Sequence, residues 1–153
     1  MSERGMEIEL IARAVILHGD RALLCRNLKH GYRYLPGGHV EFAESAPDAL
    51  MRELSEEAGL MGNVVGFVLA EEQVFRQGGT IRHEVNLVFH VELDDPPGAA
   101  IESKEAKIAF EWVRLGQLRD HDVRPVSTYQ WLPEFASAPR LWVPRWLSST
   151  IAE

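Results

Sequence analysis

The chain has 153 residues, of which 46% are hydrophobic and 25% charged, and its formal net charge at pH 7 is −7. These values are typical of a single globular domain over residues 1–153, and the acidic balance argues against a protein that binds nucleic acid polymers through a basic surface. No apolar run is long enough to span a membrane and no signal-peptide pattern is present, so we expect a cytoplasmic protein without a membrane partner.

The beginning of the chain predicts two strands and a loop. Residues 7–17 and 21–26 are rich in β-forming residues and are separated by a turn at 18–20, a pattern that predicts a hairpin. Cys25, the only cysteine, lies in this apolar stretch, and we expect it to be a small core residue rather than a nucleophile. The polar loop at 27–33 contains basic and aromatic side chains, which either contact a ligand or are simply exposed.

A pair of glycines ending at Gly38 precedes the clearest helix of the chain, predicted at residues 46–58. Ser45 is placed to cap its first turn together with Asp48 three residues later. Gly59 can end the helix because glycine adopts the left-handed conformation without strain. The glycine pair also allows the backbone to approach a ligand closely.

The two faces of this predicted helix differ in polarity. An apolar stripe at every fourth residue is directed toward the core (Leu50, Leu54 and Ala58). Three carboxylates share one turn of the other face, Glu53, Glu56 and Glu57, and Arg52 is four residues before Glu56. Their repulsion costs about 0.2–0.5 kcal/mol per pair at the surface and about 3 kcal/mol when partly desolvated. A bound divalent cation such as Mg²⁺ or Mn²⁺ would turn this repulsion into a net attraction. The alternative is that the acidic run simply faces solvent, which is the more common case for such runs.

A longer pattern extends from Gly38 to Leu60. Its fixed positions are Gly38, Glu44, Arg52, Glu53, Leu54, Glu56, Glu57, Gly59 and Leu60. This pattern resembles the Nudix hydrolase signature, G-x5-E-x7-R-E-U-x-E-E-x-G-U with U a bulky aliphatic residue, and it fills every specified position. The resemblance implies a loop–helix–loop that binds a divalent metal and cleaves a diphosphate linkage in a nucleoside diphosphate joined to another moiety.

The rest of the chain alternates strands with turns and ends in a helix. We predict a strand at 62–76, a turn at 77–80, a strand at 81–93, a loop at 94–107, a strand at 109–115, a helical turn at 116–121 and a helix at 126–136. Apolar and polar residues alternate along 81–93, which predicts a sheet covered on one face and partly lined by polar groups on the other. The order of elements indicates an α/β fold and resembles the Nudix α/β/α sandwich, a mixed sheet between helices.

The C-terminal part of the chain is rich in tryptophan. Trp131, Trp142 and Trp146 need burial, and they pack either on the domain itself or on a second subunit of a homodimer. Stacking on a nucleotide base is the remaining alternative.

The resemblance also implies roles for single residues. Glu53, Glu56 and Glu57 would bind Mg²⁺ or Mn²⁺, and the backbone carbonyl of Gly38 would add a ligand. Arg52 would orient a glutamate.

Three further glutamates have open roles. Glu44 would be an outer ligand or local support. The general base would be Glu53 in the helix, or Glu102 or Glu105 in the loop that precedes the strand at 109–115.

The resemblance leaves the substrate and one alternative function open. A (d)NTP or a nucleoside diphosphate derivative fits, and the downstream proline typical of ADP-ribose hydrolases is absent at residues 74–76. The alternative is a non-catalytic domain that senses a nucleotide. We favour the enzyme because no signature carboxylate is lost, and an isomerase on the same fold is less favoured for the same reason.

Overall fold

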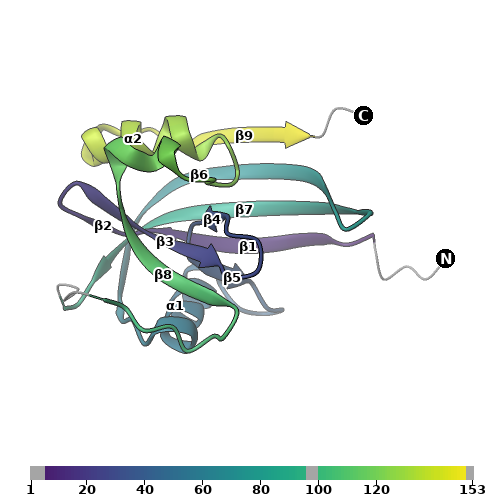
Figure 1. Cartoon of the computed structure of the whole chain (residues 1–153), viewed down its shortest axis with the longest axis horizontal. Coiled ribbons are helices and arrows are strands. Elements are labelled where there is room, and N and C mark those ends of the chain that lie inside the picture. The colour runs from purple at the N-terminus through teal and green to yellow at the C-terminus, as the bar shows by residue number, and fades with distance from the viewer. Residues whose placement is uncertain (1–5, 96–99, 151–153) are drawn as a thin grey trace.

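A computed structural model describes residues 6–95 and 100–150. Its elements are β1 (Ile8–Val15), β2 (Leu17–His18), β3 (Arg21–Asn27), β4 (Arg33–Tyr34), β5 (Gly37–His39), α1 (Ala46–Ala58), β6 (Gly62–Gln77), β7 (Thr80–Leu93), β8 (Ile108–Arg114), the 3₁₀ helix η2 (Leu115–Asp120), α2 (Thr128–Ser137), the 3₁₀ helix η3 (Pro139–Leu141) and β9 (Arg145–Thr150). Figure 1 shows α1 and α2 on opposite sides of the strands. The α/β character of the chain and a mixed sheet with helices are therefore confirmed.

The larger sheet has five strands in the order β5-β1-β7-β6-β9. It is mixed, because β1 pairs with β7 and β6 with β9 in parallel, whereas β6 and β7 form a long antiparallel hairpin. Gly78 and Gly79 have positive φ angles at the tip of that hairpin, as its predicted turn requires. This sheet, which we call sheet A, carries the helix with the carboxylates.

The predicted hairpin of residues 7–17 and 21–26 is wrong in its pairing. Strand β1 lies in sheet A, whereas β3 belongs to a second sheet with β2, β4 and β8. Only the two-residue strand β2 pairs with β3 across the turn. Both edges of β1 are already occupied by β5 and β7, so β3 has no free edge to join. The turn itself lies where the sequence predicts it.

Two apolar clusters hold the layers together. One joins α2 to both sheets through Leu24, Val88 and Leu132, and the other joins α1 to both sheets through Ala14, Leu23 and Leu54. The prediction of one covered face is therefore wrong for the C-terminal half of β7, where Val88 packs in the first cluster and Val91 in the second. Asn86, on the predicted polar face, is only 7% exposed.

The predicted ends of the helices vary in accuracy. Helix α1 spans the predicted residues, with the Ser45 hydroxyl accepting a hydrogen bond from the Asp48 amide and Gly59 ending it at φ 64°. Helix α2 begins two residues later than predicted, and β9 was not predicted at all. Cys25 is completely buried, as expected. Among the described residues no helix has the length and apolarity needed to cross a membrane.

Candidate functional site

The short strand β5 places two adjacent glycines, Gly37 and Gly38, beside α1. It pairs antiparallel with β1, and Gly38 lies opposite Ala12. A Cβ atom added to Gly38 would lie 2.4 Å from Cδ of Glu53, so any side chain there would displace that carboxylate. At Gly37 the φ angle is 147°, and an added Cβ would collide with the carbonyl oxygen of Ala12 at 1.9 Å. Both glycines are therefore required by close packing.

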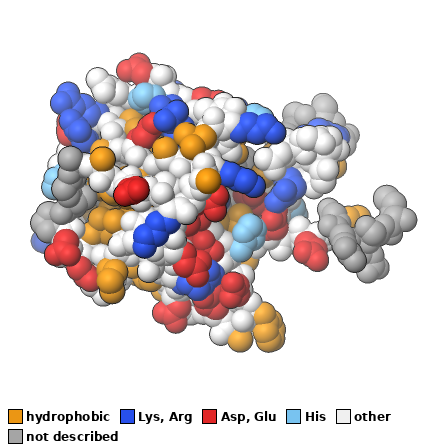
Figure 2. Space-filling model, turned by 60° about the horizontal axis from the view of Figure 1, so that its bottom comes forward, with side chains coloured by type: hydrophobic (Ala, Val, Ile, Leu, Met, Phe, Trp, Pro, Cys, Tyr) orange, Lys and Arg blue, Asp and Glu red, His pale blue; other side chains and the backbone are white. Residues whose placement is uncertain are grey.

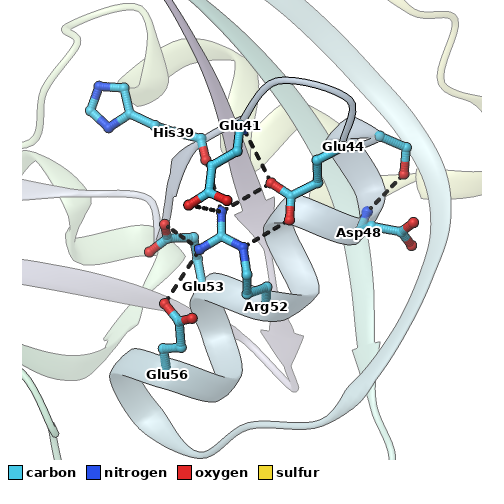
Figure 3. Close-up of polar contacts among 8 residues, drawn as sticks. His39, Glu41, Glu44, Asp48, Arg52, Glu53 and Glu56 are labelled. Atoms are coloured by element: carbon cyan, nitrogen blue, oxygen red, sulfur yellow. Dashed lines mark hydrogen bonds and ion pairs between the residues drawn. The ribbon is translucent and has the colours of Figure 1, made fainter.

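Arg52 holds the acidic side chains of this region in place (Figure 3). Its Nε and Nη2 donate to the two carboxylate oxygens of Glu44 at 2.8 and 3.0 Å. Its Nη1 donates to Glu53 at 3.1 Å and to Glu56 at 3.3 Å. Its Nη2 also donates to the carbonyl oxygen of His39 at 3.1 Å. One guanidinium thus links the loop before α1 with two of the carboxylates on the helix.

This arrangement gives Glu44 a supporting position. Hydrogen bonds from Arg52 hold the pKa of Glu44 below its usual value, so the carboxylate stays ionised and keeps the guanidinium in place. The expected pairing of Arg52 with Glu56 is present, and Glu44 and Glu53 share the same guanidinium.

Glu57 is half-buried next to Glu53. Burial, together with the neighbouring Glu53, which is close enough to hydrogen-bond with it, raises the pKa of Glu57 to about 7. The positive charge of Arg13 acts in the opposite direction, while the negative charge of Glu105 adds to the increase. Two carboxylates are therefore held together where water screens them poorly.

The structure separates the two glutamates of the loop before β8. Glu105 is exposed, but its charge is near enough to influence the pKa of Glu57. Glu102 instead lines a pocket beside the end of α1, together with Gly59 and Lys104. The amide of Lys104 donates to the carbonyl oxygen of Glu57 at 2.7 Å, which attaches this loop to the helix. Of the two loop candidates, Glu105 is the one brought to the carboxylates.

The chemistry of this region fits a divalent metal ion. The donors are hard carboxylate oxygens, and the backbone approach at Gly38 keeps Glu53 beside Glu57, whose mutual repulsion a cation would relieve. In the described residues no three His, Cys, Asp or Glu side chains are already arranged as a set that could hold a metal. Glu53 and Glu56 are bonded to Arg52 instead.

Arg13 is a member of this region that sequence reasoning missed. Its guanidinium lies 5.3 Å from the centre of the Tyr34 ring, and its Nη1 donates to the Leu35 carbonyl oxygen at 3.2 Å. The available signal was an arginine in the middle of an apolar strand. His39, which was not assigned a role, bonds to Glu9 at 2.9 Å and points away from the carboxylates in Figure 3.

Comparisons with known proteins identify the family of the chain and agree with its fold. The family model described as NUDIX domain matches residues 9–135. The E. coli ORF135 protein has 23% identity and a TM-score of 0.62, with 88% of this chain and 94% of that chain covered. An ADP-ribose pyrophosphatase from Streptococcus suis has 20% identity, a TM-score of 0.65 and coverage of 92% and 99%. A MutT protein from Bacillus halodurans has 17% identity, a TM-score of 0.68 and coverage of 94% and 91%. At these identities the likeness to the solved structures concerns the fold.

Proposed function

The chain belongs to the NUDIX domain family and is a Nudix-type pyrophosphohydrolase, and from this premise we propose that it cleaves the diphosphate linkage of a nucleoside diphosphate derivative or a (d)NTP with the aid of a divalent metal. The reaction would be attack of water on phosphorus. The observation that carries the proposal is the pair Glu53 and Glu57, held together against the backbone of Gly38.

The chain's own groups have distinct tasks in this reaction. Glu53, Glu56, Glu57 and the Gly38 carbonyl would hold Mg²⁺ or Mn²⁺, which supplies charge neutralisation for the diphosphate and a lower pKa of bound water. Arg52 keeps the carboxylate of Glu53 in position through the bond at 3.1 Å.

A carboxylate would act as the general base. The water oxygen bonds to phosphorus, its proton passes to Glu53 or Glu105, and the bridging P–O bond breaks to leave two phosphate groups. Glu105 is a candidate for the general base because its charge is near enough to raise the pKa of Glu57. Glu102 is less favoured as the base because it lines the neighbouring pocket.

The substrate is proposed at the level of a class. An ADP-ribose pyrophosphatase and a MutT protein share the fold, which supports a small nucleotide-like substrate. Residues 74–76 lack the proline expected of typical ADP-ribose hydrolases, which favours (d)NTPs or other nucleoside diphosphate derivatives.

A substrate panel tests the proposal. Turnover of NTPs, dNTPs, oxidised dGTP, ADP-ribose, nucleotide sugars and dinucleoside polyphosphates is measured with Mg²⁺, with Mn²⁺ and with EDTA. We expect metal-dependent cleavage of one class, with ¹⁸O from labelled water in one phosphate product. Binding of a nucleotide without any cleavage would instead support a sensor.

Two substitutions separate the assigned roles. Glu57→Gln should remove most metal-dependent turnover and leave the fold intact, whereas Glu92→Gln, an exposed glutamate on β7, should retain it. Wild-type turnover in Glu57→Gln would contradict the metal assignment. Glu105→Gln should lower kcat if the loop supplies the base, and an unchanged kcat would leave Glu53 in that role.

A further inference from the structure

Helix α1 covers only part of one face of sheet A. It packs mainly on β1 and β5, where Ala12 and Ala14 are completely buried beneath it. Figure 1 shows β1, β6 and β7 extending well beyond the helix toward the right of the view. On the α1 side of the sheet, this extension has no helix over it among the described residues.

The uncovered part of this face is apolar. The strand register aligns Leu10 with Val85 and, in the next row, Ala12 with Leu87, so these side chains share the face that α1 covers further along. Phe67, Trp146 and Ile8 lie on the same face through their pairing with Phe89, Ala70 and His83. We call this surface the open face and define it by Ile8, Leu10, Phe67, Val85, Leu87 and Trp146.

These side chains are unusually accessible for apolar residues in neighbouring strands. Trp146 and Ile8 are each 63% exposed, Phe67 is 42% exposed and Leu10 is 41% exposed. With full side-chain areas of roughly 150–250 Å² for large residues, these four side chains expose about 300–500 Å² of apolar surface. A patch of this size is about the largest that a monomeric soluble protein exposes, and such patches are often functional.

We propose that the open face packs against the open face of a second copy of this chain and forms a homodimer with twofold symmetry. Its apolar area is roughly half of the ~800 Å² per partner of a standard protein interface, a size that suits a weak dimer. Two apolar sheet faces can pack at a spacing of ~10 Å, with interdigitating side chains. In a twofold contact the same surface must complement itself.

The charges favour a second copy as the occupant. The chain carries a net charge of −7, so two copies repel one another over most of their surfaces. Within the described part of the open face and its adjoining rows, the Asp, Glu, Lys and Arg side chains are one acid, Glu72, and one base, Arg76. His83 lies on the same face, with its Nε2 3.8 Å from the Glu72 carboxylate. Glu72 already accepts a hydrogen bond from Ser148 at 3.0 Å. This surface therefore meets its own copy without an excess of like charge.

Sedimentation velocity of the full chain tests the dimer. Over about 1–100 µM, the range in which weak to moderate interfaces dissociate, we expect a species of twice the 17.3 kDa chain mass at the upper end. Leu10→Glu and Phe67→Glu should each raise the dimer dissociation constant by about 30-fold or more, as for a central interface residue. The control is Val126→Glu, since Val126 is 75% exposed but lies between β8 and α2.

The outcomes are distinguishable from failures of folding and of catalysis. Circular dichroism checks that each variant is folded, and Trp146→Glu replaces any variant that is not. A wild-type monomer throughout the range would overturn the proposal, as would a dimer that the open-face variants leave unchanged. The proposal is independent of the proposed reaction, because metal-dependent turnover is measured separately and need not change with the oligomeric state.

Discussion

At the scale of single residues, the absence of a side chain at Gly38 determines how closely a carboxylate approaches the backbone. We expect Gly38→Ala to lower kcat by about 100-fold, because its Cβ would push the Glu53 carboxylate away, and a shift near 1 Å has that order of effect. Steady-state kinetics with Mg²⁺ measures this loss. In Gly66→Ala the added Cβ meets nothing within 4 Å, so this control should keep its turnover. Equal kcat values for the two variants would contradict the role of Gly38.

The raised pKa of Glu57 predicts that the stability of the protein and its affinity for Mg²⁺ both depend on pH. Its pKa is about 7 in the folded protein and 4.5 in the unfolded chain, so without metal its contribution to stability is fully present below pH 4.5 and is lost as the pH rises through 7. A metal ion requires the ionised carboxylate, so the apparent Mg²⁺ affinity should rise by about tenfold per pH unit up to that pKa. Thermal melts with and without Mg²⁺, from about pH 5.5 to 8.5, measure both effects.

The variant Glu57→Gln is the control for this dependence. It cannot ionise at this position, so its melting temperature without metal should vary less over the same pH range. The stabilisation by Mg²⁺ should also be small at every pH. An equal Mg²⁺-induced shift for the wild type at about pH 5.5 and 8.5 would contradict the involvement of Glu57.

At the scale of elements, α1 could be predicted to the residue because its signals are local. Ser45 supplies the cap, and Gly59 supplies the left-handed end, within a few residues of the helix they delimit. We expect Ser45→Ala to lower the free energy of unfolding by about 1 kcal/mol, since the amide of Asp48 loses its bond of 3.2 Å. Chemical denaturation measures this change. Ser55→Ala on the exposed side of the same helix should be neutral or slightly stabilising, and a similar loss there would contradict the capping effect.

The start of α2 is anchored by a buried acid. Glu71 is 3% exposed, and both of its oxygens lie within 2.9 Å of the Ser127 hydroxyl. Burial raises the pKa of Glu71, so its contribution to stability is present below its ordinary pKa and is lost as the pH rises through the raised value. Glu71→Gln should therefore raise the melting temperature near pH 8, because the amide keeps a polar partner for Ser127 without a buried charge. Exposed Glu92→Gln is the control, and a lower melting temperature for Glu71→Gln would contradict this interpretation.

The strands could be predicted individually, but their partners could not. Alternation and turn residues locate β6 and β7, which are joined by a short turn and pair with each other. The pairing of β1 with β7 joins residues more than 70 positions apart, and the parallel pairing of β6 with β9 is similarly remote. No local signal specifies such contacts. The same reason explains why Arg13 was missed, because its role depends on Tyr34 and Leu35 across the fold.

At the scale of the whole molecule, the C-terminal segment completes sheet A, and its tryptophans differ in what they contact. Trp142 donates from Nε1 to the Val68 carbonyl oxygen at 2.7 Å and packs edge-on to Phe135 at 5.5 Å. Trp131, a residue of α2, is buried in the core, whereas Trp146 is largely exposed. Packing on the domain, one of the three alternatives from the sequence, therefore holds for Trp131 and Trp142.

This difference predicts unequal effects of the same substitution. Trp142→Phe should lower the free energy of unfolding by about 1–2 kcal/mol, because the Val68 carbonyl loses its donor in a half-buried position. For a domain of this size, that corresponds to a fall in melting temperature of roughly 2–8 °C. Trp146→Phe should change stability by less than about 0.5 kcal/mol in the monomer, as for an exposed residue. Both are measured at low protein concentration, where association through the open face does not contribute. Equal losses would show that β9, rather than the bond from Trp142, attaches the C-terminal segment to sheet A.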